Sequence, residues 1–152
     1  MIQRVQSIWL FLASLTLFLL LILPILTKTG NAGELWFQVG GLYQKAGQGT
    51  TQLAAYTPLF GFTIFTGLIC LINIFNFKNR TLQKRIILVA IVSILVIIGG
   101  AAYYAQTIPG GITGASFNAG TYLPVVSILF CVLAIRGISN DERLIRSADR
   151  LR

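Results

Sequence analysis

Histidine is absent from this 152-residue sequence, and aspartate and glutamate together occur only four times. These absences remove the commonest metal ligand, the usual general base near neutral pH and nearly every carboxylate pair. No Ser-His-Asp arrangement, phosphate-binding loop or metal cluster can be assembled from the residues that remain. We therefore expect a protein that is not an enzyme and that binds no cofactor or metal.

Charge of either sign is also scarce. Charged residues make up 11% of the chain and hydrophobic residues 55%, and the mean hydropathy is +0.79. A soluble domain has about 25% charged residues, so this composition predicts a membrane protein. The two cysteines, Cys70 and Cys131, lie within apolar runs and not at an outer surface, where a thiol oxidase would need them. We predict that both are small packing residues.

Four apolar runs are long enough to cross a membrane as helices. They cover residues 7–26, 54–76, 86–106 and 122–138. A hydrocarbon core about 30 Å thick needs about 20 helical residues, and Pro124 fits the fourth run if it occupies the first turn. The first run exceeds a secretory signal core and lacks a small-residue cleavage site after Pro24, so we predict an anchor. The predicted fold class is an all-α membrane protein, a four-transmembrane-helix bundle in one domain of residues 1–152.

The interiors of these runs carry no charged side chain. Ion and proton pathways usually place charged residues inside the bundle, so we expect no such pathway here. A cavity lined by neutral groups stays open as an alternative. The small residues Gly61, Gly67, Gly99 and Gly100 predict close helix packing, either within the chain or with another subunit.

The basic residues are divided unequally between the connecting segments. Of twelve lysines and arginines, only Lys28 and Lys45 fall in residues 27–53 and 107–121. The others are Arg4, Lys78, Arg80, Lys84, Arg85, Arg136, Arg143, Arg146, Arg150 and Arg152. The positive-inside rule therefore predicts cytoplasmic termini, a cytoplasmic loop at residues 78–85, and two outer loops. We attribute the net charge of +8 to this orientation and to anionic lipid headgroups at the basic loop and tail, and not to nucleic acid.

The first outer loop has the pattern of a β-hairpin. Glu34–Val39 and Leu42–Lys45 read as strands, and Gly40-Gly41 between them predicts a two-residue turn. Because a lone hairpin is marginal in water, we expect support from a third strand at residues 115–118 or from a partner protein.

Alternation along the hairpin predicts two faces. Leu35, Phe37 and Val39 line one face, and Trp36 and Gln38 line the other. The candidate contact residues here are Trp36, Phe37 and Tyr43. They are either interfacial anchors at the headgroups or a recognition surface.

Residues 139–152 have the pattern of a separate amphipathic helix. Ser139 or Asn140 can cap its start, and the acidic and basic residues suit its two ends. Apolar residues recur at helical spacing away from the arginines, which predicts a C-terminal amphipathic helix along the inner leaflet. Its candidate contact residues are Asp141, Glu142, Arg143, Arg146, Arg150 and Arg152. They contact either lipid headgroups or a cytoplasmic partner.

The two ends of the chain also resemble a known family. Residues 1–7, MIQRVQS, and residues 136–152, RGISNDERLIRSADRLR, are similar to DUF4293, a group of small four-span proteins from Bacteroidota whose function is not established. The resemblance covers essentially the whole length. It implies a multi-pass protein of the bacterial inner membrane and supplies no catalytic residue.

A weaker likeness is architectural. Four spans, cytoplasmic termini and a long first outer loop with strand character resemble the claudin-like tetraspan proteins, and Gly33-Glu-Leu-Trp36 is similar to their Gly-Leu-Trp motif. The cysteine pair expected after the tryptophan is missing, so the comparison concerns shape alone.

These observations favour one function and leave two alternatives. We expect a non-enzymatic accessory or scaffolding subunit of a larger inner-membrane assembly, whose partners are the lipid bilayer and other membrane-protein subunits. One alternative is a transporter of small solutes or lipids with a neutral cavity. The other is an enzyme that takes its chemistry from a cofactor held between helices.

Overall fold

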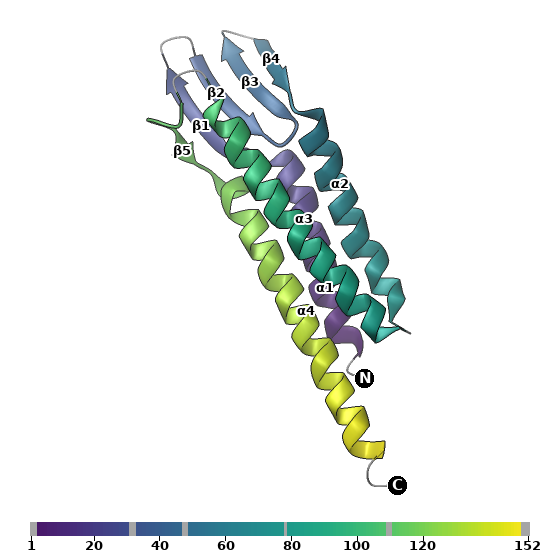
Figure 1. Cartoon of the computed structure of the whole chain (residues 1–152). Helices are drawn as coiled ribbons and strands as arrows, with labels where there is room; N and C mark the ends of the chain where they lie inside the picture. The colour runs from purple at the N-terminus through teal and green to yellow at the C-terminus, as the bar shows by residue number, and fades with distance from the viewer. Residues whose placement is uncertain (1–2, 31–32, 47–48, 78, 109–110, 150–152) are drawn as a thin grey trace.

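Four long helices and one small antiparallel sheet make up the structure, a computed structural model that describes residues 3–30, 33–46, 49–77, 79–108 and 111–149 (Figure 1). The helices are α1 (Gln3–Ile22), α2 (Thr57–Ile72), α3 (Arg80–Gln106) and α4 (Ala119–Asp149), and a 3-10 turn, η1 (Asn73–Asn76), extends α2. The strands are β1 (Leu26–Gly30), β2 (Gly33–Gln38), β3 (Gly41–Ala46), β4 (Gly49–Ala55) and β5 (Ser116–Phe117).

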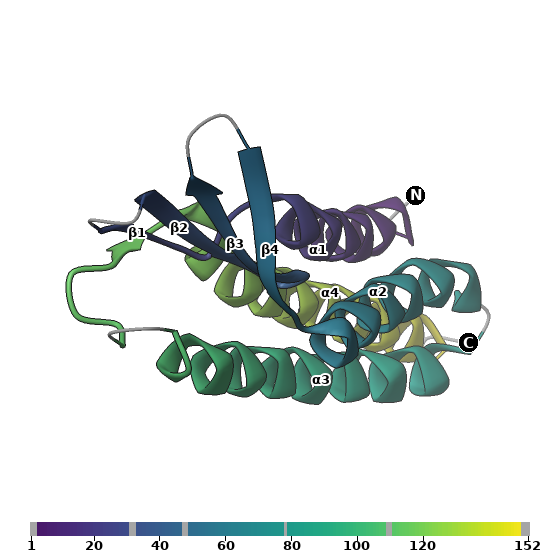
Figure 2. The ribbon, with the colours of Figure 1, turned by 90° about the horizontal axis from the view of Figure 1, so that it is seen from above.

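The helices form a bundle in which neighbours alternate in direction, and the sheet closes one end (Figures 1 and 2). We call this the sheet end and the opposite one the basic end. Each helix, α2 together with η1, contains a segment long and apolar enough to cross a membrane. The chain therefore has the architecture of a multi-pass membrane protein, as its sequence predicts.

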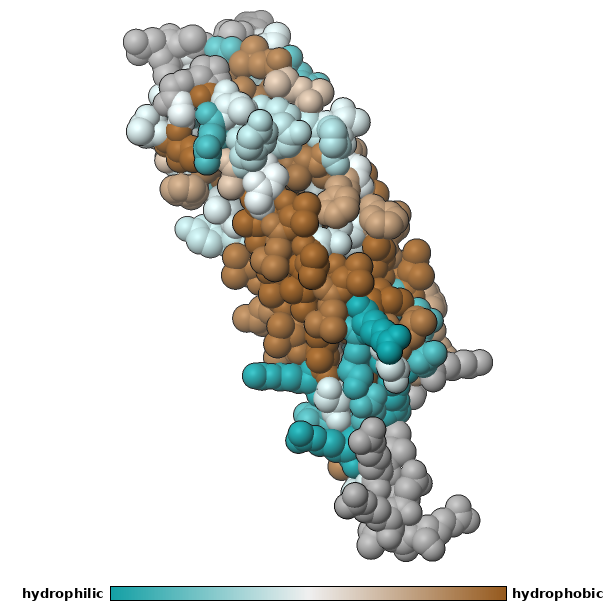
Figure 3. Space-filling model, in the orientation of Figure 1, coloured by the Kyte–Doolittle hydropathy of each residue, from teal (hydrophilic) through white to brown (hydrophobic). Residues whose placement is uncertain are grey.

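Apolar side chains cover the outside of the bundle as well as its core. Phe65, Val92 and Val125 are 58%, 60% and 61% exposed, and Figure 3 shows a broad hydrophobic band between the two more polar ends. Soluble monomers rarely expose apolar patches of this extent. Exposure of these side chains to water is unfavourable. A lipid environment would remove that cost because the hydrocarbon interior solvates them.

The core has two parts. Towards the basic end, all four helices contribute to one cluster that includes Leu10, Cys70, Ile87 and Ile138. At the sheet end, a second cluster joins the helices to the inner face of the sheet, where Phe37 packs with residues such as Ile97. The sheet is therefore held by the bundle and is not an isolated hairpin.

The strand order is β4-β3-β2-β1-β5, with all pairs antiparallel. The predicted hairpin is confirmed as β2 and β3, but its turn is one residue earlier than predicted, because Gln38 pairs with Gly41 and leaves Val39-Gly40 as the turn. A Cβ at Gly41 would lie 2.3 Å from the carbonyl oxygen of Ala54. Gly41 is thus required by the close approach of β4.

The predicted third strand at residues 115–118 is present as β5, and it pairs with β1 and not with the hairpin itself. The sequence pattern does not predict strands β1 and β4, because the apolar residues at their ends are part of the first two apolar runs, 7–26 and 54–76. Pro24 ends the first helical segment, and the next residue, Ile25, donates its N–H to Phe37 O at 2.7 Å, which starts the sheet.

The helix limits differ from the predicted runs. α1 ends at Ile22 instead of residue 26, α2 begins at Thr57 instead of residue 54, and α3 begins at Arg80 instead of residue 86. Asn79 explains the last difference, because its side chain accepts a hydrogen bond from Leu82 N at 3.3 Å and caps the helix.

The separate helix predicted for residues 139–152 is wrong for the described part of that segment, because α4 continues without a break to Asp149. Ser139 and Asn140 lie within it and cap nothing. The cause is burial: Ile138 and Asp141 are 0% and 4% exposed and keep this stretch packed against the bundle.

Candidate functional site

The outward face of the sheet brings together two of the aromatic residues expected at a contact surface. Trp36 and Tyr43 are direct cross-strand partners, and their rings stack with centroids 6.1 Å apart and planes 17° apart. The Glu34–Lys45 pair lies beside them on the same face. Side chains alternate between faces of a strand, so this face is aromatic and polar.

Phe37, the third expected contact residue, does not belong to this surface. It is 1% exposed and packs edge-to-face on Tyr56, with ring centroids 5.7 Å apart. Phe37 points to the opposite face of the sheet from Trp36, so its side chain is buried in the core. There it holds the sheet against the bundle.

Strand β4 forms one edge of the sheet. It pairs with β3 on one side only, and every side chain of the strand except that of Ala54 is exposed. Leu53 is 50% exposed. Proteins commonly protect an edge strand with lysine, proline, a β-bulge or a covering element. β4 contains neither lysine nor proline, but its pairing with β3 shifts register between Leu42 and Tyr43 and leaves Leu53 as an extra residue. The strand therefore presents unpaired backbone groups at the sheet end.

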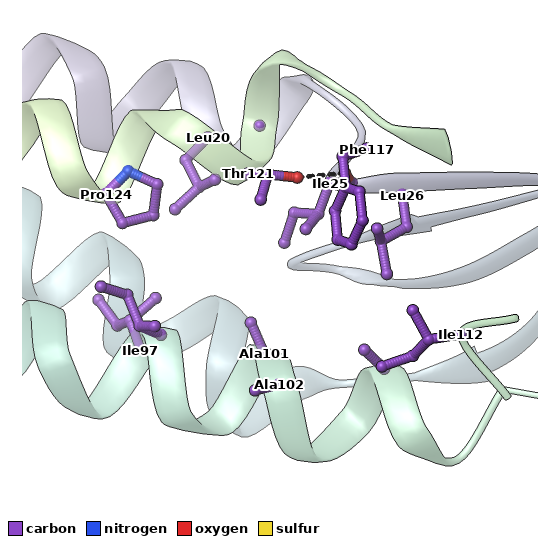
Figure 4. A pocket seen from close by; sticks show the side chains of 13 residues that line it. Leu20, Ile25, Leu26, Ile97, Ala101, Ala102, Ile112, Phe117, Thr121 and Pro124 are labelled. Atoms are coloured by element: carbon purple, nitrogen blue, oxygen red, sulfur yellow. Dashed lines mark hydrogen bonds between the residues drawn. The ribbon is translucent and has the colours of Figure 1, made fainter. Parts of the chain in front are cut away.

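A hollow lies between α3, α4 and the sheet, with a volume of about 190 Å³ (Figure 4). Its lining includes Leu20, Ile97, Ala101, Phe117, Thr121 and Pro124. The hydroxyl of Thr121 is already bonded to Ile25 O at 2.6 Å, so the lining offers an incoming molecule almost only apolar atoms. We call this hollow the apolar groove.

At the basic end, the expected contact residues of the tail have different positions from those predicted. Asp141 is 4% exposed and accepts a hydrogen bond from Gln6 Nε2 on α1, so it does not face headgroups. Glu142 forms an ion pair of 2.7 Å with Lys84 on α3. Arg143 is exposed. Arg146 lies in α4, and the Arg150 and Arg152 predictions lie outside the described residues.

Sequence reasoning missed the partners of Asp141 and its polar neighbours. Asn73 and Gln83 are both 1% exposed, and each donates its side-chain amide to the backbone carbonyl of the other, at 3.1 and 3.2 Å. The available signal was an amide or carboxyl residue one turn beyond an apolar core position in α1, η1, α3 and α4, whereas the other buried polar residues of the helices are serine and threonine.

Cys70 and Cys131 are both free thiols in the core, 1% and 0% exposed. They belong to the same apolar cluster, in agreement with the predicted packing role. Among the residues that the structure describes, no group of three His, Cys, Asp or Glu side chains is arranged to hold a metal ion.

The fold and these surfaces define a class: a small four-helix protein of membrane-spanning type that carries a five-stranded sheet at one end. The chain belongs to the family described as "Domain of unknown function (DUF4293)", whose model matches residues 2–151. This match confirms the resemblance seen at the two ends of the sequence. Comparison with curated proteins and with solved structures found no match.

Proposed function

We propose that the chain is a non-catalytic accessory subunit of an assembly in a bacterial inner membrane, and that it binds its partner through strand β4. The observation that supports this is the open edge of the sheet, whose side chains are exposed along almost the whole strand. Such an edge is able to accept an extended segment of another protein as an additional strand, in which backbone hydrogen bonds supply affinity and alternate side chains supply specificity.

Charge supports an orientation with the sheet outside the cell and both termini in the cytoplasm. Lys28 and Lys45 lie in the sheet, whereas Arg80, Lys84 and Arg85 lie on the first turns of α3 at the basic end. The excess of basic residues at one end is what the positive-inside rule associates with the cytoplasm. The proposed partner segment is therefore extracytoplasmic.

Site-specific photo-crosslinking in native membranes tests this function. A photoreactive residue at Thr51 or Leu53 on β4 should give one discrete adduct with a partner protein. The matched control is Thr27 on β1, which is half-buried and pairs with Trp36 on one side and Ser116 on the other. A partner adduct at Thr27 equal to that at Leu53, or adducts of this chain only with itself, would count against the proposal.

The apolar groove supports a second candidate, a protein that handles lipids. Its lining residues come from α1, α3, α4 and the sheet end, and they are almost entirely apolar. A hydrocarbon tail suits such a lining, whereas a polar solute does not. Purification in mild detergent separates the two candidates: the chain recovered alone with a stoichiometric lipid favours lipid handling, and recovery with a stoichiometric protein favours the accessory role.

A further inference from the structure

The apolar groove forms because the start of α4 packs on the end of α1 and leaves α3 apart from it. Gly120 donates its N–H to Pro24 O at 3.2 Å, and a Cβ at Gly120 would lie 2.6 Å from the same oxygen. α4 also contacts α1 more extensively than it contacts α3. On the other side of the groove, α3 contributes the small side chains of Ala101, Ala102 and Ala105, which leave the space unfilled (Figure 4).

The size and lining of the apolar groove suit a hydrocarbon. An engineered cavity of about 150 Å³ with an apolar lining stays free of water and binds benzene, and this groove has a volume of about 190 Å³. The lining gives water almost no hydrogen-bond partner, because the Thr121 hydroxyl already donates to Ile25 O. Ala102 lines the groove and is also exposed. The groove therefore opens to the outside of the bundle, within reach of a membrane lipid.

Lys28 lies at the outer end of the groove. Leu26 lines the groove and pairs with the core residue Phe37. Lys28 is two residues further along β1, so it points to the same face of the sheet, with its Cα about 7 Å beyond that of Leu26. Its Nζ donates to Gly111 O at 3.1 Å, and the next residue, Ile112, lines the groove. This contact holds a positive charge beside the groove.

The carboxylates of the chain lie away from this side of the sheet. Glu34 and Lys45 are cross-strand partners on the outward face. The other acidic residues belong to α4 towards the basic end, and they are Asp141, Glu142 and Asp149. The groove side of the sheet end is therefore positive in character, which suits an anionic headgroup.

We propose that the apolar groove binds one acyl chain of an anionic phospholipid, whose phosphate accepts a hydrogen bond from Lys28 Nζ. This site rests on the lipid-handling candidate above, and it adds the class of lipid and the headgroup contact. Lysine commonly binds phosphate as a point charge. The glycerol of a phospholipid spans the interval between Lys28 and the groove. In the orientation proposed above, the bound lipid belongs to the outer leaflet.

Native mass spectrometry of the purified full-length chain tests the headgroup contact. Delipidated protein in detergent is titrated with phosphatidylglycerol and, separately, with phosphatidylcholine that has the same acyl chains. One phosphatidylglycerol should bind per chain, about fivefold more tightly than phosphatidylcholine, which is the effect expected of one lysine beside an anionic headgroup. Lys28→Gln should remove this preference. The matched control Lys45→Gln removes the same charge from the opposite face of the sheet and should retain it.

A second pair of variants tests the groove itself. Ala102→Phe places a bulky side chain at the opening and should prevent binding of both lipids. Val96→Phe is the control, because Val96 is 57% exposed on the same helix and does not line the groove. Circular dichroism reports whether each variant folds, and Ala102→Leu repeats the test with a smaller side chain if the larger one prevents folding.

The outcomes distinguish the headgroup contact from lipid handling as a whole. The headgroup contact is overturned, and lipid handling remains, if Ala102→Phe prevents binding but phosphatidylglycerol has no advantage, or if Lys28→Gln keeps that advantage. The absence of a discrete adduct with one lipid would overturn the whole proposal and count against lipid handling as well. An adduct that Ala102→Phe leaves unchanged would do the same, because the lipid would then lie outside the groove.

Discussion

Glycines in the helices are of two kinds, which differ only in what a side chain would meet. At Gly67 and Gly100 an added Cβ would lie 3.2 Å from the Phe18 ring and 3.0 Å from Leu59, so both support helix contacts. At Gly61 and Gly99 it would meet nothing within 4 Å. The sequence predicted close packing for all four, because spacing alone does not show which face of a helix meets a neighbour.

Gly120 gives the sharpest test at this scale. A Cβ there would lie 2.6 Å from the carbonyl oxygen of Pro24, the same atom that accepts the hydrogen bond from Gly120 N. We expect Gly120→Ala to lower the free energy of unfolding by about 1–3 kcal/mol, as overpacking does. Gly99→Ala is the control and should be neutral or stabilising by up to about 1 kcal/mol. Chemical denaturation in mixed micelles measures both, and equal effects would contradict the close approach.

At the scale of elements, the sequence predicted the hairpin and all four helices but misplaced their ends. Apolar residues at a strand end, such as Leu26 and Ala54, look the same in the sequence as the end of a membrane helix. The burial of Asp141 was missed for a similar reason: it directly follows a plausible cap, Asn140, and only its packing on Gln6 shows that it is buried. Contacts with residues distant in the chain decide where an element ends and whether a polar side chain is buried.

The continuity of α4 is testable at Asn140, whose side chain is exposed. Proline at this position within a helix removes a backbone hydrogen bond and should cost about 3 kcal/mol. Asn140→Ala should be neutral or slightly stabilising, because alanine has the higher helix propensity. A separate helix capped by Asn140 would give the reverse pattern, in which alanine costs about 1 kcal/mol. Comparing Tm for the two variants decides between these structures.

At the scale of the whole molecule, an apolar band separates two polar ends of different character (Figure 3). The helices of this band were predictable because their long apolar runs leave few alternatives. The function was not predictable from the sequence. There are two candidate contact surfaces, the β4 edge and the apolar groove, and both depend on how segments far apart in the chain meet. No local motif marks either of them.

The orientation proposed for the molecule predicts a labelling pattern in intact cells. Thr50 on β4 and Ser147 on α4 are both exposed, whereas the native Cys70 and Cys131 are buried. A membrane-impermeant maleimide should label Thr50→Cys directly and Ser147→Cys only after the membrane is permeabilised. The unsubstituted chain is the control and should remain unlabelled. The opposite pattern would reverse the proposed orientation and place the β4 edge in the cytoplasm.

The pairing of β1 with β5 has a consequence for the order of biogenesis. Leu26 pairs with Phe117 and Thr27 with Ser116, so this edge of the sheet joins the segment after α1 to the segment just before α4. During synthesis, β1 can therefore pair with β5, its second neighbour, only after most of the chain has been made. Contacts between residues so distant in the chain form slowly. The complete sheet therefore forms only after synthesis has passed α3 and reached β5, whereas the β4 edge at the other side of the sheet is made early.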